Sequence, residues 1–289
     1  MIDSKTKLIG LIGYPSRHSL SPFIQNSFIS ENKKNAAYMV FEFSPENLIR
    51  AFEGMKALGF MGFNVTMPYK KKVFEMVDSA DDTSRATKSV NTVKILPDSS
   101  CMGFNTDADG FMQAAEGKGY LWAGKALVIG AGGAARSTIY GLLKKKVNKI
   151  YIYNRSLKKA KNIKTLFEIN DRIEIIKDLN DLKEEDTNFI INCTPIGMAI
   201  DEKLKNLLPV PEHWDLKDKF IMDMVYKPVT TPFIKKALAQ GAKVVNGLDM
   251  LVSQAAFSFK IWFDMDNLPR TQAAEAGIQR LLERGMHGS

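Results

Sequence analysis

Short apolar runs alternate with segments of helical period through the first third of the chain. Four runs are rich in β-branched and aromatic residues, as strands are: KLIGLIG (7–13), AAYMVFEF (36–43), FMGFNVTM (60–67) and SVNTVKIL (89–96). Between them, apolar residues recur at helical spacing over 21–34, 45–58 and 69–78. Because strands that alternate with helices build a sheet covered by helices, this pattern predicts an α/β domain with mostly parallel strands.

A second alternation of the same kind begins at ALVIGAGG (126–133). It continues through apolar runs at 149–156, 172–178, 189–198, 220–226 and 243–247. The sequence therefore predicts two consecutive α/β units that meet between residues 105 and 124. After Gly247 the pattern is purely helical, over 248–263 and 271–285. This pattern leaves open which of the two units the helices pack against.

Length and composition are those of an ordinary folded enzyme. The 289 residues favour two domains, and 45% hydrophobic and 25% charged residues are usual proportions. The first residues, MIDSKTKLIGLIG, contain no signal-peptide core, and no apolar run approaches the roughly 18 residues that a membrane span needs. We therefore expect a cytoplasmic protein with no membrane partner.

Cysteine, histidine and net charge exclude several other classes. Cys101 and Cys193 form no CxxC pair, and with three histidines there is no metal-ligand spacing, so we expect neither a disulfide nor a metal. The net charge of +8 is scattered over lysine-rich helical segments without the interleaved aromatic residues of a nucleic-acid platform. We expect no nucleic-acid partner; anionic small ligands, or simply a solvated lysine surface, explain the charge.

A glycine-rich segment follows the first strand of the second unit. In VIGAGGAARS (128–137), Gly130, Gly132 and Gly133 directly follow an apolar strand and open a helix. Small residues there permit a tight turn, and the first amides of the helix face a pyrophosphate. In this strand-helix-strand context the segment predicts a dinucleotide site, although a merely glycine-rich turn is the alternative.

The next strand ends where a site for NAD usually carries an acidic residue. Here the chain has Asn154, Arg155 and Ser156, followed by Lys158 and Lys159. A guanidinium, a hydroxyl and nearby ammonium groups suit a 2′-phosphate better than a free ribose diol. The sequence therefore favours NADP over NAD, with use of both cofactors left open. The alternative is a helix N-terminus with incidental basic residues.

Three consecutive lysines occupy the predicted helix that begins at Pro68. At about 100° per residue, Lys70 shares a face with the apolar residues, whereas Lys71, Lys72 and Glu75 lie opposite. We expect Lys71 and Glu75 to form a surface pair. An inward cation in the first turn of a helix is a candidate for proton transfer or anion binding. The alternative is a stem packed on the core with a solvated head.

Polar residues near the other strand ends suit a small polyol. Asn64 and Thr66 alternate along one strand, Asn91 ends the later stretch SVN, and Asp107 lies in GFNTDADG. Their amides, hydroxyl and carboxylate can bind several hydroxyl groups, and Asp107 could hold Lys70 in place. Taken singly, each is also an ordinary turn or strand-end residue.

Two serines precede the first predicted helix, in HSLSP (18–22). The hydroxyls of Ser19 and Ser21 can cap that helix or bind a carboxylate.

The motifs resemble, in order and along nearly the whole chain, those of the shikimate dehydrogenases and their quinate/shikimate relatives. They are HSLSPFIQN, NVTMPYK, VNT, NTDADG, GAGGAAR, NRS, DMVYKPVTTP and GLDMLVSQAAFSFKIW. The resemblance implies an N-terminal α/β substrate-binding domain at 1–108, a Rossmann-type NADP-binding domain at 109–246, and C-terminal helices at 247–289 that return to the first domain. The implied reaction is the reversible NADP-dependent reduction of 3-dehydroshikimate to shikimate, in aromatic amino-acid biosynthesis.

The resemblance also implies roles for individual residues. Lys70 is expected to be the acid/base, with Asp107 as its partner. The substrate carboxylate is assigned to Ser19 and Ser21, and its hydroxyls and surroundings to Asn64, Thr66, Asn91, Asp107, Tyr226 and Gln254. The expected cofactor-binding residues are Asp82, Gly130, Ala131, Gly132, Gly133, Ala134, Asn154, Arg155, Ser156, Lys159, Thr194, Met224 and Gly247. Among these, Met224 and Gly247 are expected to flank the nicotinamide.

Two departures leave the branch of the family open. Gln25 stands where many shikimate-specific members have His, and Ser156 replaces a Thr. A quinate/shikimate dehydrogenase that uses NAD or NADP is therefore the alternative, as a monomer or homodimer. A dinucleotide-binding regulator without catalysis is a further alternative, and the presence of both Lys70 and Asp107 argues against it.

Overall fold

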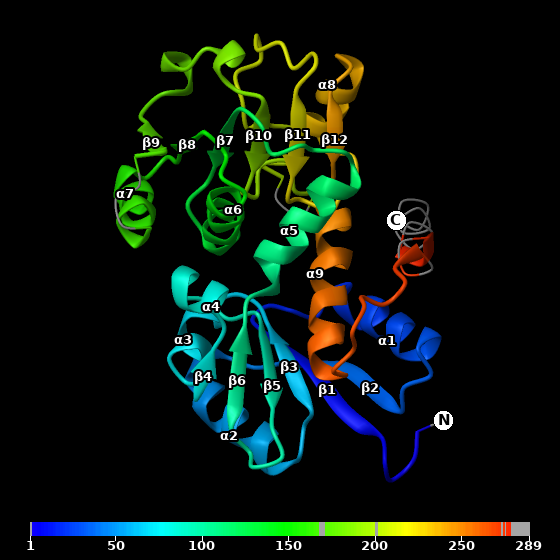
Figure 1. The fold of residues 1–289 in the computed structure, drawn as a ribbon. Helices are drawn as coiled ribbons and strands as arrows, with labels where there is room; N and C mark the ends of the chain where they lie inside the picture. The colour runs from blue at the N-terminus through cyan, green and yellow to red at the C-terminus, as the bar shows by residue number, and fades with distance from the viewer. Residues whose placement is uncertain (1, 168–170, 200–201, 273, 275, 279–289) are drawn as a thin grey trace. The chain divides into compact units, whose positions relative to one another are not determined.

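The computed structural model describes residues 2–167, 171–199, 202–272, 274 and 276–278 and separates into two compact units (Figure 1). Unit 1 comprises residues up to Gly110 and those from Val252 on, and unit 2 comprises Phe111–Leu251. The chain passes between the units within two helices, α5 (Thr106–Gly117) and α9 (Gly247–Trp262). The predicted boundaries at 108/109 and 246/247 fall within α5 and at the start of α9.

Unit 1 is built on a mixed six-stranded sheet of order β2-β1-β3-β5-β6-β4. The strands are β1 (Lys7–Gly13), β2 (Ala36–Glu42), β3 (Gly62–Val65), β4 (Ser79–Ala80), β5 (Thr92–Ile95) and β6 (Cys101–Phe104). β1 is parallel to β2 and β3, but β5 is antiparallel to both β3 and β6. The prediction of mostly parallel strands is confirmed for this part, since β5 alone of these six strands runs in the opposite direction. A short connection joins β5 to β6, which only antiparallel strands allow.

The helices of unit 1 are α1 (Ser21–Glu31), α2 (Leu48–Ala57), which follows the turn η1 (Pro45–Asn47), α3 (Lys70–Phe74) and α4 (Asp82–Thr87). The predicted helix over 69–78 is shorter than expected, and it begins at Lys70 rather than at Pro68. The part of α9 from Val252 on packs in this unit: Trp262 Nε1 donates to the Val93 carbonyl at 2.9 Å, and the rings of Phe28 and Phe259 meet edge to face. The helix predicted over 271–285 falls largely outside the described residues.

Unit 2 has an all-parallel sheet of order β12-β11-β10-β7-β8-β9. The strands are β7 (Lys125–Ile129), β8 (Lys149–Tyr153), β9 (Ile173–Ile176), β10 (Phe189–Asn192), β11 (Phe220–Asp223) and β12 (Lys243–Val245). The helical segments are α6 (Gly133–Lys144), α7 (Leu157–Leu166), α8 (Pro232–Ala239) and the turns η2 (Leu179–Asp181) and η3 (Glu184–Asp186). The strand order reverses between β7 and β10, as in a Rossmann fold, so the predicted fold class is confirmed.

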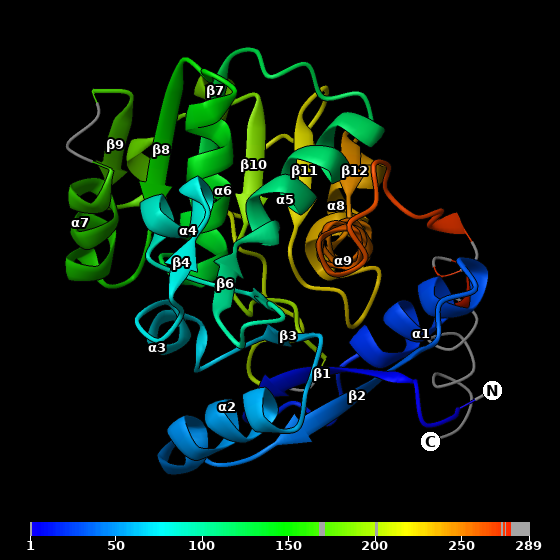
Figure 2. The same cartoon turned by 60° about the horizontal axis from the view of Figure 1, so that its bottom comes forward.

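Alternate residues of the parallel strands supply two cores in unit 2. Val128 and Ile191 pack with α6 and α7, whereas Leu127 and Ile190 pack with α8. α6 and α7 lie side by side in Figure 1, and in Figure 2 both lie to the left of α8. Helices therefore cover both faces of the sheet, which explains why its strands read as continuous apolar runs.

Among the described residues, no helix combines the length and apolar character needed to cross a bilayer. The same residues contain no group of three or more histidines, cysteines, aspartates or glutamates arranged to hold a metal ion. Cys101 and Cys193 are free thiols, and burial raises the pKa of Cys101 to about 11 and that of Cys193 to about 12.

Candidate active site

Lys70 and Asp107 form an ion pair in unit 1. Lys70 is the first residue of α3, Asp107 lies in the first turn of α5, and Lys70 Nζ donates to Asp107 Oδ2 at 2.6 Å. Their side chains are 23% and 9% exposed, whereas Lys71 and Lys72 are exposed. Helical phase thus selected the inward lysine. The expected Lys71–Glu75 pair was wrong: Lys72 Nζ contacts Glu75 at 3.0 Å, because the short helix brings residues three apart together.

The carboxylate of Asp107 is held from two sides. Asn91 Nδ2 donates to Asp107 Oδ1 at 2.7 Å, leaving Oδ2 to the lysine. The backbone N–H of Asp107 also donates to Asn105 Oδ1 at 3.1 Å. Since each oxygen has its own donor, the carboxylate is fixed in orientation and directs the ammonium of Lys70.

A buried polar layer supports Asn91. Its Oδ1 accepts the Thr106 N–H at 2.9 Å, and its Nδ2 lies 3.4 Å from Gln254 Oε1 on α9. The structure therefore brings Gln254 next to Asn91, which also contacts Asp107.

Asn64 is embedded in the same layer. Its Nδ2 lies within 3.1 Å of the Asn91 carbonyl and of the hydroxyls of Thr92 and Ser258, and its Oδ1 accepts from the Tyr38 hydroxyl at 2.8 Å. Both amide hydrogens are engaged by the protein. This geometry makes Asn64 a support for Asn91 and leaves it no free donor for a ligand.

Ser19 and Ser21 lie together before α1. Ser19 Oγ donates to Ser21 Oγ at 3.1 Å and lies 3.2 Å from the Ser21 backbone N–H. The N-cap of α1 is Leu20, and no side chain caps the helix.

Glu42 anchors the loop in front of these serines. It accepts the backbone N–H groups of Ser16 at 2.6 Å and of Arg17 at 3.0 Å. These contacts lower the pKa of Glu42 below its ordinary value.

Thr66 directly follows β3, and its N–H donates to the Ile12 carbonyl at 2.9 Å. Its half-buried side chain lies four residues before Lys70 on the same connection. Tyr226, by contrast, belongs to unit 2, where it follows β11. The remaining predicted substrate-binding residues all belong to unit 1.

The glycine loop joins β7 to α6 in unit 2. Gly130 has φ +116°, a backbone conformation that favours glycine, and a Cβ there would lie 3.0 Å from the Cys193 carbonyl oxygen. Gly132 is the N-cap of α6, and no side chain caps this helix. A Cβ on Gly132 or Gly133 would meet nothing within 4 Å. The space beside the first turn, with Ala131 and Ala134 on either side of these glycines, therefore fits a pyrophosphate.

The predicted 2′-phosphate residues Asn154, Arg155 and Ser156 lie between β8 and α7, and Lys159 lies in the first turn of α7. Asn154 Nδ2 donates to the Ser156 carbonyl at 2.9 Å, which closes the turn, and Ser156 is the N-cap of α7 without a side-chain hydrogen bond. Arg155 and Lys159 are exposed, and neither forms an ion pair with any other described residue. Their cationic groups are therefore available to an anion.

Gly247 and Met224 meet at the start of α9. A Cβ on Gly247 would lie 2.4 Å from the Met224 carbonyl oxygen, so only glycine permits this approach. Thr194 follows β10 and bonds to Asn192 through both its N–H and its hydroxyl, at 3.0 and 2.6 Å. Asp82 belongs to the other unit: it opens α4 in unit 1, pairs with Arg85, and has a side chain that is 88% exposed.

Sequence reasoning missed the residues that hold these groups. Thr92, Thr106 and Ser258 lie behind Asn64 and Asn91, and Asn192 and Asp223 end β10 and β11. The signal available was a polar residue at the end of an apolar run, as in SVNTV, FIINC and FIMDM.

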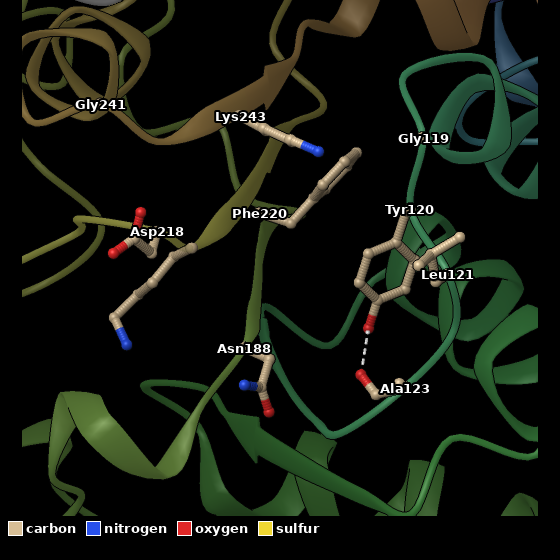
Figure 3. A pocket seen from close by; sticks show the side chains of 10 residues that line it. Gly119, Tyr120, Leu121, Ala123, Asn188, Asp218, Phe220, Gly241 and Lys243 are labelled. Atoms are coloured by element: carbon tan, nitrogen blue, oxygen red, sulfur yellow. Dashed lines mark hydrogen bonds between the residues drawn. The ribbon is translucent and has the colours of Figure 1, made fainter.

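A pocket opens at the amino-terminal ends of the unit 2 strands, opposite the ends that the glycine loop follows (Figure 3). Its lining residues precede or begin β7, β10, β11 and β12: Gly119, Tyr120, Leu121, Ala123, Asn188, Asp218, Lys219, Phe220, Gly241 and Lys243. The Tyr120 hydroxyl donates to the Ala123 carbonyl at 3.2 Å. Because the glycine loop follows the carboxyl end of β7, this pocket is separate from it.

Comparison with known proteins places the whole chain in one family. Three family models match: the shikimate dehydrogenase substrate binding domain at residues 11–93, shikimate / quinate 5-dehydrogenase at 113–224, and the shikimate 5′-dehydrogenase C-terminal domain at 247–267. A shikimate dehydrogenase (NADP(+)) of Methanococcus maripaludis is 40% identical over 267 residues, which cover 91% of this chain and 94% of that protein.

Solved structures agree with this assignment. A shikimate dehydrogenase in complex with NADP+ is 35% identical, covers 98% of each chain and superposes with a TM-score of 0.88. The enzyme of Thermus thermophilus in complex with NADP(H) and shikimate is 28% identical, covers 95% of this chain and 99% of its own, and has a TM-score of 0.85. The chain belongs to the shikimate dehydrogenase family.

Proposed function

We propose that the protein is an NADP-dependent shikimate dehydrogenase that interconverts 3-dehydroshikimate and shikimate. The observation that carries the proposal is the Lys70–Asp107 pair fixed by Asn91. Lys70 and Asn91 lie within the residues that match the substrate binding domain, and Asp107 lies after them in the chain. The relatives named shikimate dehydrogenase (NADP(+)) support both the substrate and the cofactor.

Lys70 acts as the acid/base. In the reducing direction, the substrate carbonyl carbon gains a hydride and its oxygen gains a proton, so a protonated amine within reach of that oxygen completes the alcohol. NADPH supplies the hydride when it is bound. Asp107 orients the ammonium of Lys70 and balances its charge, and the positive charge stabilises the developing alkoxide.

The substrate is held by polar groups of unit 1. Ser19 and Ser21 bind its carboxylate, and Thr66, Asn91 and Gln254 bind its hydroxyls. Asn64 acts in this scheme by holding Asn91, because its hydrogen-bonding groups are already engaged. Tyr226 of unit 2 borders the substrate.

The cofactor is held by unit 2. The loop from Gly130 to Ala134 binds the pyrophosphate, and Asn154, Arg155, Ser156 and Lys159 bind the 2′-phosphate. Met224 and Gly247 flank the nicotinamide. Thr194 lies on the loop that follows β10, next to the loop after β11 that carries Met224. Asp82 is assigned to the cofactor by family resemblance alone.

A quinate/shikimate dehydrogenase is the second candidate. The family model for the central part of the chain carries both substrate names. The family resemblance also places Gln25 where many shikimate-specific members have His. The test is a matrix of kcat/KM for shikimate and quinate, each with NADP+ and NAD+. The first proposal requires the shikimate and NADP+ combination to exceed the others at least about tenfold, a difference of about 1.4 kcal/mol in transition-state binding. Equal values for the two acids would favour the second candidate, and no turnover with any combination would refute both.

A further inference from the structure

A buried polar cluster closes the carboxyl ends of β10 and β11. Asn192 and Asp223 are register partners at the ends of these strands, Thr231 is the N-cap of α8, and all three are fully buried. Asp223 Oδ1 accepts from Asn192 Nδ2 at 2.9 Å and from the Val225 N–H at 3.1 Å, while Oδ2 accepts from the Thr231 hydroxyl at 2.6 Å. Each oxygen of the carboxylate is thus engaged, and the cluster ties three elements together.

The cluster also fixes the two loops that follow these strands. Asn192 Oδ1 accepts both the N–H and the hydroxyl of Thr194, and Asn192 Nδ2 donates to the Ile196 carbonyl at 3.1 Å. The Met224 N–H donates to the Asn192 carbonyl at 2.9 Å. The positions of Thr194 and Met224 therefore depend on Asn192, whose side chain is in turn held by Asp223.

The carboxylate of Asp223 has no cation beside it. It forms no ion pair with any lysine, arginine or histidine in the part of the chain that the structure describes. Burial raises the pKa of Asp223 to about 6, against the opposing effect of its three hydrogen bonds. A buried charge without a counter-ion costs stability, and an amide of the same shape would avoid that cost. Stability alone therefore does not explain an aspartate at position 223, and its carboxylate points to a role in function.

We propose that Asp223 is a positioning residue for the nicotinamide half of the cofactor, acting through Asn192 and Thr231 on the loops that carry Thr194 and Met224. The inference rests on the proposed function, because that function assigns these two residues to the cofactor. Asp223 itself touches neither substrate nor cofactor in this scheme. Only a carboxylate offers acceptors to the Asn192 amide, the Val225 N–H and the Thr231 hydroxyl at once.

The test compares Asp223→Asn and Thr231→Val with Thr231→Ser, which keeps the hydroxyl. Asp178→Asn is the matched control, because Asp178 is an exposed carboxylate of the same unit that accepts the nearby Asn180 N–H. The Kd of NADP+ is measured by titration calorimetry, and KM for NADP+ and for shikimate by steady-state kinetics. We expect Asp223→Asn and Thr231→Val to raise the Kd and KM of NADP+ about tenfold, the value of one charged hydrogen bond. The KM of shikimate stays within about twofold, and Thr231→Ser and Asp178→Asn bind NADP+ like the wild type.

Wild-type affinity for NADP+ in Asp223→Asn would overturn the proposal, and so would an equal rise in both KM values, which indicates general damage. If Asp223→Asn does not fold, the two Thr231 variants decide the question. The proposal fails unless Thr231→Val loses affinity for NADP+ and Thr231→Ser keeps it. A wild-type protein that binds NADP+ but does not oxidise shikimate would refute the proposed function, while the calorimetric comparison would still test Asp223.

Discussion

Burial of the Asp223 carboxylate makes the stability of the protein depend on pH in a specific way. In the folded chain the pKa of Asp223 is about 6, raised by burial from 3.8. Folding therefore favours the protonated form of Asp223. As pH rises from 3.8 to about 6, ionisation of the carboxyl lowers the free energy of unfolding by a growing amount. At about 1.4 kcal/mol per pH unit, the cost is about 3 kcal/mol above pH 7 and about 1 kcal/mol at pH 4.5.

Asp223→Asn removes this titration and leaves the other ionisable groups in place. The altered hydrogen bonds of the amide change stability by an amount that does not depend on pH, so this amount cancels between two pH values. The free energy of unfolding of the variant, relative to the wild type, should therefore be about 2 kcal/mol higher at pH 7.5 than at pH 4.5. The direction follows from the sign of the shift: only the wild type loses stability as Asp223 ionises.

The assay is a urea titration of each protein at each of the two pH values, monitored by circular dichroism, with the same buffer and ionic strength throughout. A difference between variant and wild type that is equal at both pH values would show that Asp223 titrates alike in the folded and unfolded chain. A difference that is larger at pH 4.5 would show that the folded protein favours the carboxylate. Either result would refute the reasoning from burial.

Three further substitutions test other parts of the structure. Gly247→Ala places a Cβ 2.4 Å from the Met224 carbonyl oxygen, so the backbone at Met224 or Gly247 must move. Because both residues are assigned to the nicotinamide, we expect the KM of NADP+ to rise at least about tenfold, and unchanged kinetics would contradict this packing. Arg155→Ala should lower kcat/KM with NADP+ by about 10- to 100-fold and leave that with NAD+ nearly unchanged, because only NADP+ carries the 2′-phosphate; parallel losses would argue against that contact. Asn64→Ala should lower the thermal midpoint and raise the KM of shikimate, since it unties Asn91 from its buried layer, and a change confined to the KM would indicate direct substrate contact instead.

The sequence predicted most of the elements because their periodicity is strong. Each long apolar run became a strand, and the glycine loop lies between β7 and α6 as expected. β4 and β6 were missed because they are short and lack a distinct alternation, and the reversed direction of β5, which makes the first sheet mixed, was not predicted. Local patterns describe single elements, whereas strand direction depends on pairing partners that lie far apart in sequence.

At the site, the sequence predicted side-chain direction better than side-chain partners. The phase of the helix placed Lys70 inward correctly, although the helix starts two residues later than predicted and ends before Glu75. It gave the wrong partner to Glu75, since that pairing depends on where the helix ends. Helical phase also could not indicate that the Asn64 amide donates to the hydroxyls of Thr92 and Ser258, because Ser258 lies on α9, far from Asn64 in sequence.

The most direct test of the account is the kcat of Lys70→Ala for shikimate oxidation with NADP+, beside Lys72→Ala as the matched exposed lysine of the same helix. Circular dichroism and the thermal midpoint verify that both variants fold. We expect kcat to fall by about 10²- to 10⁴-fold for Lys70→Ala, the usual contribution of a positioned acid/base, and to change little for Lys72→Ala. A folded Lys70→Ala protein that keeps most of the wild-type kcat would contradict the assignment of Lys70 as the acid/base.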